Sequence, residues 1–176
     1  MGMKPKKAKQ GQSPMDAALA YLTAKPRTVR EVEEKLDALD FGEGDVIQTM
    51  ARLVELDLVD DERFAADFVS TRLATKPLSR RKLREQLYAR KLPGVLIDEA
   101  MAVVDDAAEE MNARRVAEKY VRQFACFEGE EQKRRVIKRL MGRGFAYEAM
   151  SAALEAVFGD AQGLADVEEG EEDDED

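Results

Sequence analysis

The stretch Tyr21-Leu22-Thr23-Ala24-Lys25-Pro26-Arg27-Thr28 recurs 51 residues later as Arg72-Leu73-Ala74-Thr75-Lys76-Pro77-Leu78-Ser79. The match continues downstream without a gap, and a further offset of 53 residues reaches a third copy. The apolar positions that correspond in the three copies are Val32, Leu36 and Phe41, then Leu83, Leu87 and Leu92, and finally Val136, Leu140 and Phe145. Repetition at this period is typical of small units that bury their apolar faces by stacking in tandem.

Each copy has the pattern of short helices. Thr28 and Glu31 form a capping-box pattern ahead of apolar residues at helical spacing, and Asp45 with Gln48 repeats it. The apolar residues around the second box are Val46, Ile47, Met50, Leu53 and Val54. Helices of about three turns are marginal alone, so these helices are expected to pack in groups.

The third helix of each copy aligns after a one-residue shift, which pairs Ile47 with Ile97 and Met150. Residues that break helices precede it in every copy. These turns are Gly42-Glu43-Gly44, Pro93-Gly94 and Gly142-Arg143-Gly144. Each copy therefore reads as three helices joined by short connections.

The pattern predicts an all-α protein of three tandem three-helix, helix-turn-helix-like repeats, with nine main helices between Met15 and Phe158 and no sheet. The expected repeats span residues 15–60, 61–105 and 106–159. Outside them we expect a disordered basic arm at residues 1–14 and a disordered acidic tail at residues 160–176, because neither composition supports a buried core.

The net charge of −9 is unevenly distributed along the chain. From Asp160 onward there are ten acidic residues and no basic one. Residues 76–91 carry seven basic residues against the single acid Glu85, and residues 114–143 carry ten basic against four acidic residues. The two basic blocks are large enough to attract a polyanion.

The residue types exclude several kinds of chemistry. There is no histidine, so catalysis by imidazole and metal sites that require an imidazole ligand are both excluded. The lone Cys126, between Phe124 and Phe127, is predicted to be a buried, inert thiol. No apolar run approaches the roughly 20 residues that span a bilayer. We therefore expect a cytoplasmic binding protein with no enzyme activity, no metal and no cofactor.

The candidate binding residues are the basic side chains on and just after the second helix of repeats two and three. They are Arg80, Arg81, Lys82, Arg84, Arg90, Lys91, Lys133, Arg134, Arg135, Lys138, Arg139 and Arg143. Members three or four residues apart, such as Arg81 with Arg84 and Arg135 with Arg139, share a helical face. An ordinary solvated surface is the alternative interpretation of the same charges.

The segment Leu58-Val59-Asp60-Asp61-Glu62-Arg63-Phe64-Ala65, followed by Phe68-Val69 and Arg72, resembles the signature of the RecX family of regulatory proteins. Arg84-Glu85-Gln86-Leu87 and Arg143-Gly144-Phe145 resemble two further segments of that family. The resemblance covers about residues 15–158. Departures from the family pattern are Leu92-Pro93-Gly94 and the acidic tail.

The resemblance implies a cytoplasmic, monomeric modulator of the RecA recombinase, built from tandem three-helix repeats that form an elongated, curved module. It implies binding to the RecA–single-stranded DNA filament and inhibition of recombinase, ATPase and coprotease activities in DNA repair and the SOS response. The basic helices can approach the DNA inside that filament, and whether they touch it stays open from the sequence. The motif residues expected to be structural are Asp60, Asp61, Glu62, Arg63 and Phe64, with both aspartates capping a helix.

Two alternatives stay open from the sequence. A basic helix in a helix-turn-helix-like unit is also compatible with direct binding in the major groove of DNA. The acidic tail is compatible with folding back over the basic helices in competition with DNA, and equally with a role in solubility alone.

Overall fold

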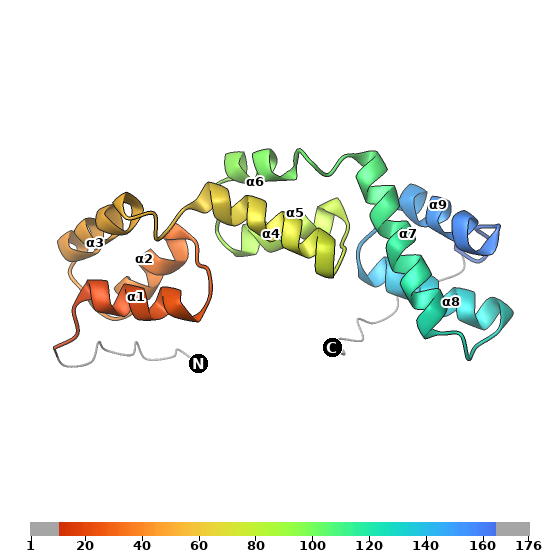
Figure 1. Ribbon diagram of the computed structural model, residues 1–176, viewed down its shortest axis with the longest axis horizontal. Helices are drawn as coiled ribbons and strands as arrows, with labels where there is room; N and C mark the ends of the chain where they lie inside the picture. Colours follow the sequence, from red (N-terminus) through yellow and green to blue (C-terminus); the bar gives the residue numbers. More distant parts are fainter. Residues whose placement is uncertain (1–10, 165–176) are drawn as a thin grey trace. The chain divides into compact units, whose positions relative to one another are not determined.

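The computed structural model describes residues 11–164, which form nine α-helices (Figure 1). These are α1 (Pro14–Ala24), α2 (Val29–Asp37), α3 (Glu43–Glu55), α4 (Asp61–Thr75), α5 (Arg80–Ala89), α6 (Gly94–Met101), α7 (Asp106–Gln123), α8 (Gly129–Gly142) and α9 (Tyr147–Phe158). No strand occurs within residues 11–164, so the predicted all-α fold of three-helix repeats is confirmed. Over the same range, no helix has both the length and the apolar character needed to cross a bilayer.

The chain divides into two compact units, which are described separately. The first unit contains the described residues up to Asp67 together with Leu87–Ala100, and the second contains Phe68–Gln86 together with the described residues from Met101 onward. Most of the expected basic arm and acidic tail, residues 1–10 and 165–176, lies outside the described residues.

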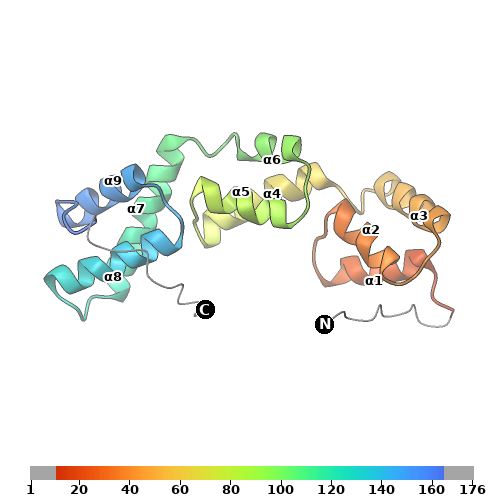
Figure 2. The ribbon, with the colours of Figure 1, turned by 180° about the vertical axis from the view of Figure 1, so that it is seen from behind.

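In the first unit, helices α1, α2 and α3 pack against one another (Figure 2). Ser13 and Thr28 each close a capping box, the first with Asp16 and the second with Glu31 as predicted. The side chains buried between the helices are Ala17, Ala18, Val32, Leu36, Val46, Met50, Leu53 and Val59. The helical spacing of these residues therefore produces the core of this repeat.

Helix α3 begins earlier than its predicted capping box. Gly42 is the N-cap without a side-chain hydrogen bond, so the predicted cap at Asp45 is wrong. Val46 is buried as the fourth residue of α3, whereas Ile47 is 61% exposed. The fourth residues of α6 and α9 are the buried Ile97 and Met150. The offsets of 51 and 53 residues thus continue without the proposed shift.

The turn before the third helix uses the same backbone conformation in each repeat. Asp40, Lys91 and Gly144 have φ values of 67°, 62° and 77°, and they are separated by the repeat offsets. Asp40 and Lys91 carry side chains at this position, but at Gly144 there is no room for one. An added Cβ would lie 2.8 Å from Cγ of Lys82 and 3.0 Å from Oγ of Ser79. The turn at this position therefore requires glycine.

In the second unit, α7 packs against both α8 and α9 (Figure 1). Its buried core consists of Ala113, Val116, Ala117, Val136, Ile137, Leu140, Phe145, Ala149, Met150, Ala153, Leu154 and Leu164. Leu164 lies beyond the end predicted for the folded part. The ordered chain therefore continues five residues past Gly159, because Asp160 pairs with Lys133 and Leu164 is buried.

Candidate nucleic-acid interface

An arginine joins the first and second repeats, within the first unit. The Arg90 guanidinium donates to the carbonyl of Pro26 at 3.1 Å and to the carboxylate of Glu31 at 2.8 Å. It also lies 4.7 Å from the ring centroid of Phe64. In return, the Thr28 hydroxyl donates to the Arg90 carbonyl at 2.8 Å. We call this set of contacts the first joint.

An equivalent arginine joins the second and third repeats, within the second unit. The Arg143 guanidinium donates to the carbonyl of Pro77 at 2.8 Å and to the Tyr120 hydroxyl at 3.1 Å. The backbone N–H of Ser79 donates to the Arg143 carbonyl at 3.2 Å. We call this set the second joint. Arg90 and Arg143 are separated by the repeat offset of 53 residues, as are the turns that carry them.

Each joint also contains a carboxylate from the next repeat. Asp61 accepts from the backbone N–H of Val29, the first residue of α2, at 2.8 Å. Glu109 accepts from the backbone N–H of Arg80, the first residue of α5, at 3.2 Å, and from its Nε at 2.6 Å. The positive end of a helix dipole stabilises each carboxylate.

The adjacent aspartates Asp60 and Asp61 cap two different helices. Asp60 caps α4, because its carboxylate accepts from the backbone N–H of Arg63 at 2.9 Å. Asp61 caps α2 of the preceding repeat rather than its own helix. Burial of Asp61 raises the pKa of its carboxyl above the usual value, and the negative charge of Asp60 acts in the same direction.

At least six of the twelve predicted basic residues are held by partners from other helices or turns. Lys133 is only 4% exposed and pairs with Asp160. The others are Arg80 with Glu109 and Asp106, Lys82 with the Gly142 carbonyl, Lys91 with Glu34, and the joint residues Arg90 and Arg143. Moving such a group to a ligand would leave its present partner unpaired, so these six are weaker candidates than their charge suggests.

Five of the other six predicted residues are exposed on α5 or α8. Arg81 is exposed and pairs with Glu85 one turn along α5, an exposed pair of the kind that contributes little to stability. Arg84 is half-buried, and Arg134 and Lys138 are exposed on α8. The remaining two, Arg135 and Arg139, belong to a more ordered arrangement.

Three arginines of α8 and its C-cap lie over three aromatic rings. The Arg135 guanidinium is 3.9 Å from the ring centroid of Phe127. Arg139 is 6.0 Å from Phe124 and 5.7 Å from Tyr120, and Arg143 is 5.6 Å from Tyr120. The spacing of four residues puts the arginines on one face of α8. We call these six side chains the arginine–aromatic ladder.

The rings of the ladder are themselves in contact. Tyr120 and Phe124 are stacked with centroids 5.6 Å apart, and Phe127 meets Phe124 edge-on at 6.3 Å. Gln132 donates from its side chain to the carbonyls of Val121 and Phe124, which fixes the end of α7 against α8. The rings are half-buried, so the ladder is a preformed surface.

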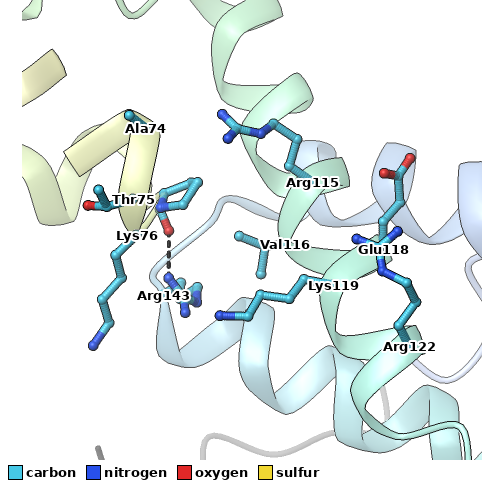
Figure 3. Close-up of a pocket in the computed structure, with 10 residues that line it drawn as sticks. Ala74, Thr75, Lys76, Arg115, Val116, Glu118, Lys119, Arg122 and Arg143 are labelled. Carbon is cyan, nitrogen blue, oxygen red and sulfur yellow. Dashed lines mark hydrogen bonds between the residues drawn. The ribbon is translucent and has the colours of Figure 1, made fainter. Parts of the chain in front are cut away.

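The ladder leads into a basic pocket beside α7. The pocket has a volume of about 310 Å³. Arg143 lies on its wall and donates to the Pro77 carbonyl, the hydrogen bond that is dashed in Figure 3. The pocket is lined by Ala74, Thr75, Lys76, Pro77, Arg115, Val116, Glu118, Lys119, Arg122 and Arg143. An adjoining hollow of about 440 Å³ adds Tyr120, Gln123 and Arg139. Six basic residues and one acid line the two together.

Sequence reasoning missed four basic residues of this pocket, namely Lys76, Arg115, Lys119 and Arg122. Arg115, Lys119 and Arg122 recur at intervals of four and three residues, which is a helical-face signal already present in the sequence. They lie on the first helix of the third repeat, whereas the predicted residues lie on and just after the second helix of repeats two and three. Arg115 also donates to the carbonyl of Leu73 at 3.1 Å, which ties α7 to the end of α4.

The basic residues of the pocket lower the pKa of the Tyr120 hydroxyl. Burial by itself raises the pKa of the Tyr120 hydroxyl, but the hydrogen bond from Arg143 and the charges of Lys119 and Arg139 outweigh burial and lower the pKa below its usual value. Clustered cations beside aromatic faces suit phosphates and stacked bases. The arrangement is therefore suited to a single-stranded nucleic acid.

Cys126, between two rings of the ladder, differs from its prediction. Its thiol is exposed, whereas the sequence predicted a buried one. The reason is local: the helix ends at Gln123, and the turn that follows directs Phe124 and Phe127, but not Cys126, toward α8.

The fold and the two joints define a class of all-α proteins made of tandem three-helix domains. Family models described as the first, second and third three-helix domains of RecX match residues 15–53, 60–101 and 108–154. The chain belongs to the RecX family of regulatory proteins, as its sequence signature indicated.

Individual relatives agree with this assignment. The chain is 32% identical over 154 residues to the regulatory protein RecX of Chlorobaculum tepidum, covering 88% of this chain and 94% of that protein. It is 28% identical over 171 residues to the regulatory protein RecX of Streptomyces coelicolor, covering 91% of each. The crystal structure of RecX from Lactobacillus salivarius has the same fold, with a TM-score of 0.67 at 23% identity over 88% of this chain and 96% of that chain.

Proposed function

We propose that this protein binds the filament that RecA forms on single-stranded DNA and inhibits its recombinase, ATPase and coprotease activities in DNA repair and the SOS response. Membership of a family of regulatory proteins supports a regulatory role. In this proposal the protein acts as a monomer in the cytoplasm, without catalytic activity of its own. The three repeats correspond to residues 15–60, 61–105 and 106–159, and the third carries most of the contact with the DNA.

The observation that carries the proposal is the arginine–aromatic ladder beside two adjoining hollows that six basic residues line together. Basic side chains neutralise phosphates, and aromatic rings or guanidinium planes stack on bases that are not paired. A filament keeps its DNA single-stranded and extended, so both kinds of contact are available along it. The exposed Arg81, Arg134 and Lys138 add to the attraction at longer range.

The proposal is tested by RecA-dependent ATP hydrolysis on single-stranded DNA with stoichiometric amounts of this protein. We expect the wild-type chain to reduce hydrolysis. The double substitution Arg135→Gln, Arg139→Gln should weaken filament binding about tenfold or more, since a base-stacking contact contributes about 1–3 kcal/mol. Binding of the wild type should also fall steeply with salt, because neutralised phosphates release counterions.

The control for this experiment is the double substitution Arg30→Gln, Arg52→Gln. It removes the same two positive charges from exposed side chains of α2 and α3, outside the ladder and the pocket. It should inhibit RecA like the wild type. Unchanged hydrolysis in the presence of the wild-type protein would contradict the proposal, and equal inhibition by the double variant would exclude the ladder from the site.

A second candidate function is direct DNA binding without RecA. It is favoured by the exposed Arg134 and Lys138 on α8, the second helix of a three-helix unit. Affinities for duplex DNA, single-stranded DNA and the filament separate the two functions. A preference for duplex over both other ligands would support this second function and contradict the first.

A further inference from the structure

We propose that residues 165–176 of the same chain bind the arginine–aromatic ladder and the basic pocket, and so compete with nucleic acid for this surface. The proposed function identifies the displaced partner, but docking of the segment itself does not depend on RecA. The segment that binds the site belongs to the same chain, so the protein itself limits the access of nucleic acid to this surface.

Charge complementarity is the first argument. Residues 165–176 contain nine acidic residues and no basic one. The ladder and pocket contain Lys76, Arg115, Lys119, Arg122, Arg135, Arg139 and the largely buried Arg143 on one unit, and Arg135 also pairs with Glu131 on the same helix. Glu118 is the only acidic residue that lines the two hollows. A run of carboxylates therefore meets a field of the opposite sign here.

Reach is the second argument. The described chain ends at Leu164, which is buried in the same unit, and Gly163 lies beside the Glu130 carboxylate near the start of α8. From Glu130 to Arg143 the axis of α8 advances about 20 Å at about 1.5 Å per residue. Twelve residues in extended form span about 40 Å. The segment is thus long enough to follow the arginines of α8 as far as the pocket.

Tethering makes a weak contact effective. A segment joined by a short link experiences an effective concentration of about a millimolar or more at a site on its own molecule. Salt screens the attraction, because the Debye length falls from about 30 Å at 0.01 M to about 8 Å at 0.15 M. Competition should therefore be strongest at low ionic strength.

Cys126 provides a direct test of docking. It is the only cysteine in the sequence, its thiol is exposed, and in the sequence it stands between Phe124 and Phe127 of the ladder. A nitroxide spin label on Cys126 should broaden the NMR amide signals of residues 165–176 at low salt. The broadening should disappear at high salt and in the variant Arg135→Gln, Arg139→Gln. Reduction of the nitroxide gives the diamagnetic reference.

The matched control in this test is again Arg30→Gln, Arg52→Gln, which should retain the broadening. Circular dichroism of each variant establishes that the helices are intact. Equal signals in the oxidised and reduced samples, or broadening that survives in the double variant, would overturn the proposal. Because neither RecA nor DNA is present, that result would leave the proposed function untouched.

Competition is tested with a single-stranded oligothymidylate as the probe. Deletion of residues 165–176, or replacement of their acids by the corresponding amides, should tighten binding by about three- to tenfold at low salt and much less at high salt. If the full-length and shortened chains bind the oligothymidylate with equal affinity at both salt concentrations, residues 165–176 do not compete with nucleic acid. That result would overturn the competitive role and favour a role in solubility.

Discussion

At the scale of single residues, Gly144 is the described glycine at which an added Cβ would meet the closest contacts. Its φ of 77° is disfavoured for other residues, and an added Cβ would meet Lys82 and Ser79 of the preceding repeat. Gly144→Ala should therefore destabilise the protein by about 1–3 kcal/mol, measured by denaturant unfolding. The control Gly44→Ala lies in α3 with nothing within 4 Å of the new methyl group, and it should leave stability unchanged or slightly higher. Equal losses for both would refute this account of the turn.

Asp61 should make the stability of the first joint dependent on pH. Its pKa is raised in the folded state, mainly by burial, so its contribution to stability is largest below the unfolded pKa and is lost as pH rises through the folded pKa. Asp61→Asn keeps an acceptor for the Val29 N–H without the charge. We expect the wild type to lose stability relative to this variant as pH increases from about 3.5 to about 7. Unfolding free energies of both chains across that interval check the sign, and parallel curves would contradict it.

At the scale of helices and turns, the second joint depends on the planar guanidinium of Arg143. This side chain is 8% exposed and donates to Pro77 and Tyr120 with separate nitrogens. Arg143→Lys keeps the charge but cannot satisfy both acceptors in the same geometry, so we expect a loss of about 1–3 kcal/mol in unfolding free energy. The exposed Arg114→Lys on α7 should change stability by less than about 0.5 kcal/mol. A lysine variant as stable as the wild type would show that charge alone holds the joint.

At the scale of the whole molecule, the repeats were predictable from the sequence because helical spacing and caps such as Thr28 with Glu31 are local signals. The shift assigned at Ile47 was an error, since adjacent apolar residues in α3 leave the buried face ambiguous until the start of the helix is known. The spacing of the basic residues did not predict which of them bind carboxylates and which lie over aromatic rings. Arg80 meets Glu109, 29 residues away, whereas Arg139 meets the rings of α7, and only tertiary packing separates these two cases.

The two joints also determine which repeats separate when the protein begins to unfold. The same link, an arginine bound to the carbonyl of a proline in the preceding repeat, is made twice along the chain. The middle repeat takes part in both links, whereas each outer repeat takes part in one. In a linear array with nearest-neighbour coupling, an outer member is released by breaking a single coupling. Loss of one joint should thus free one outer repeat while the link between the other two repeats stays in place.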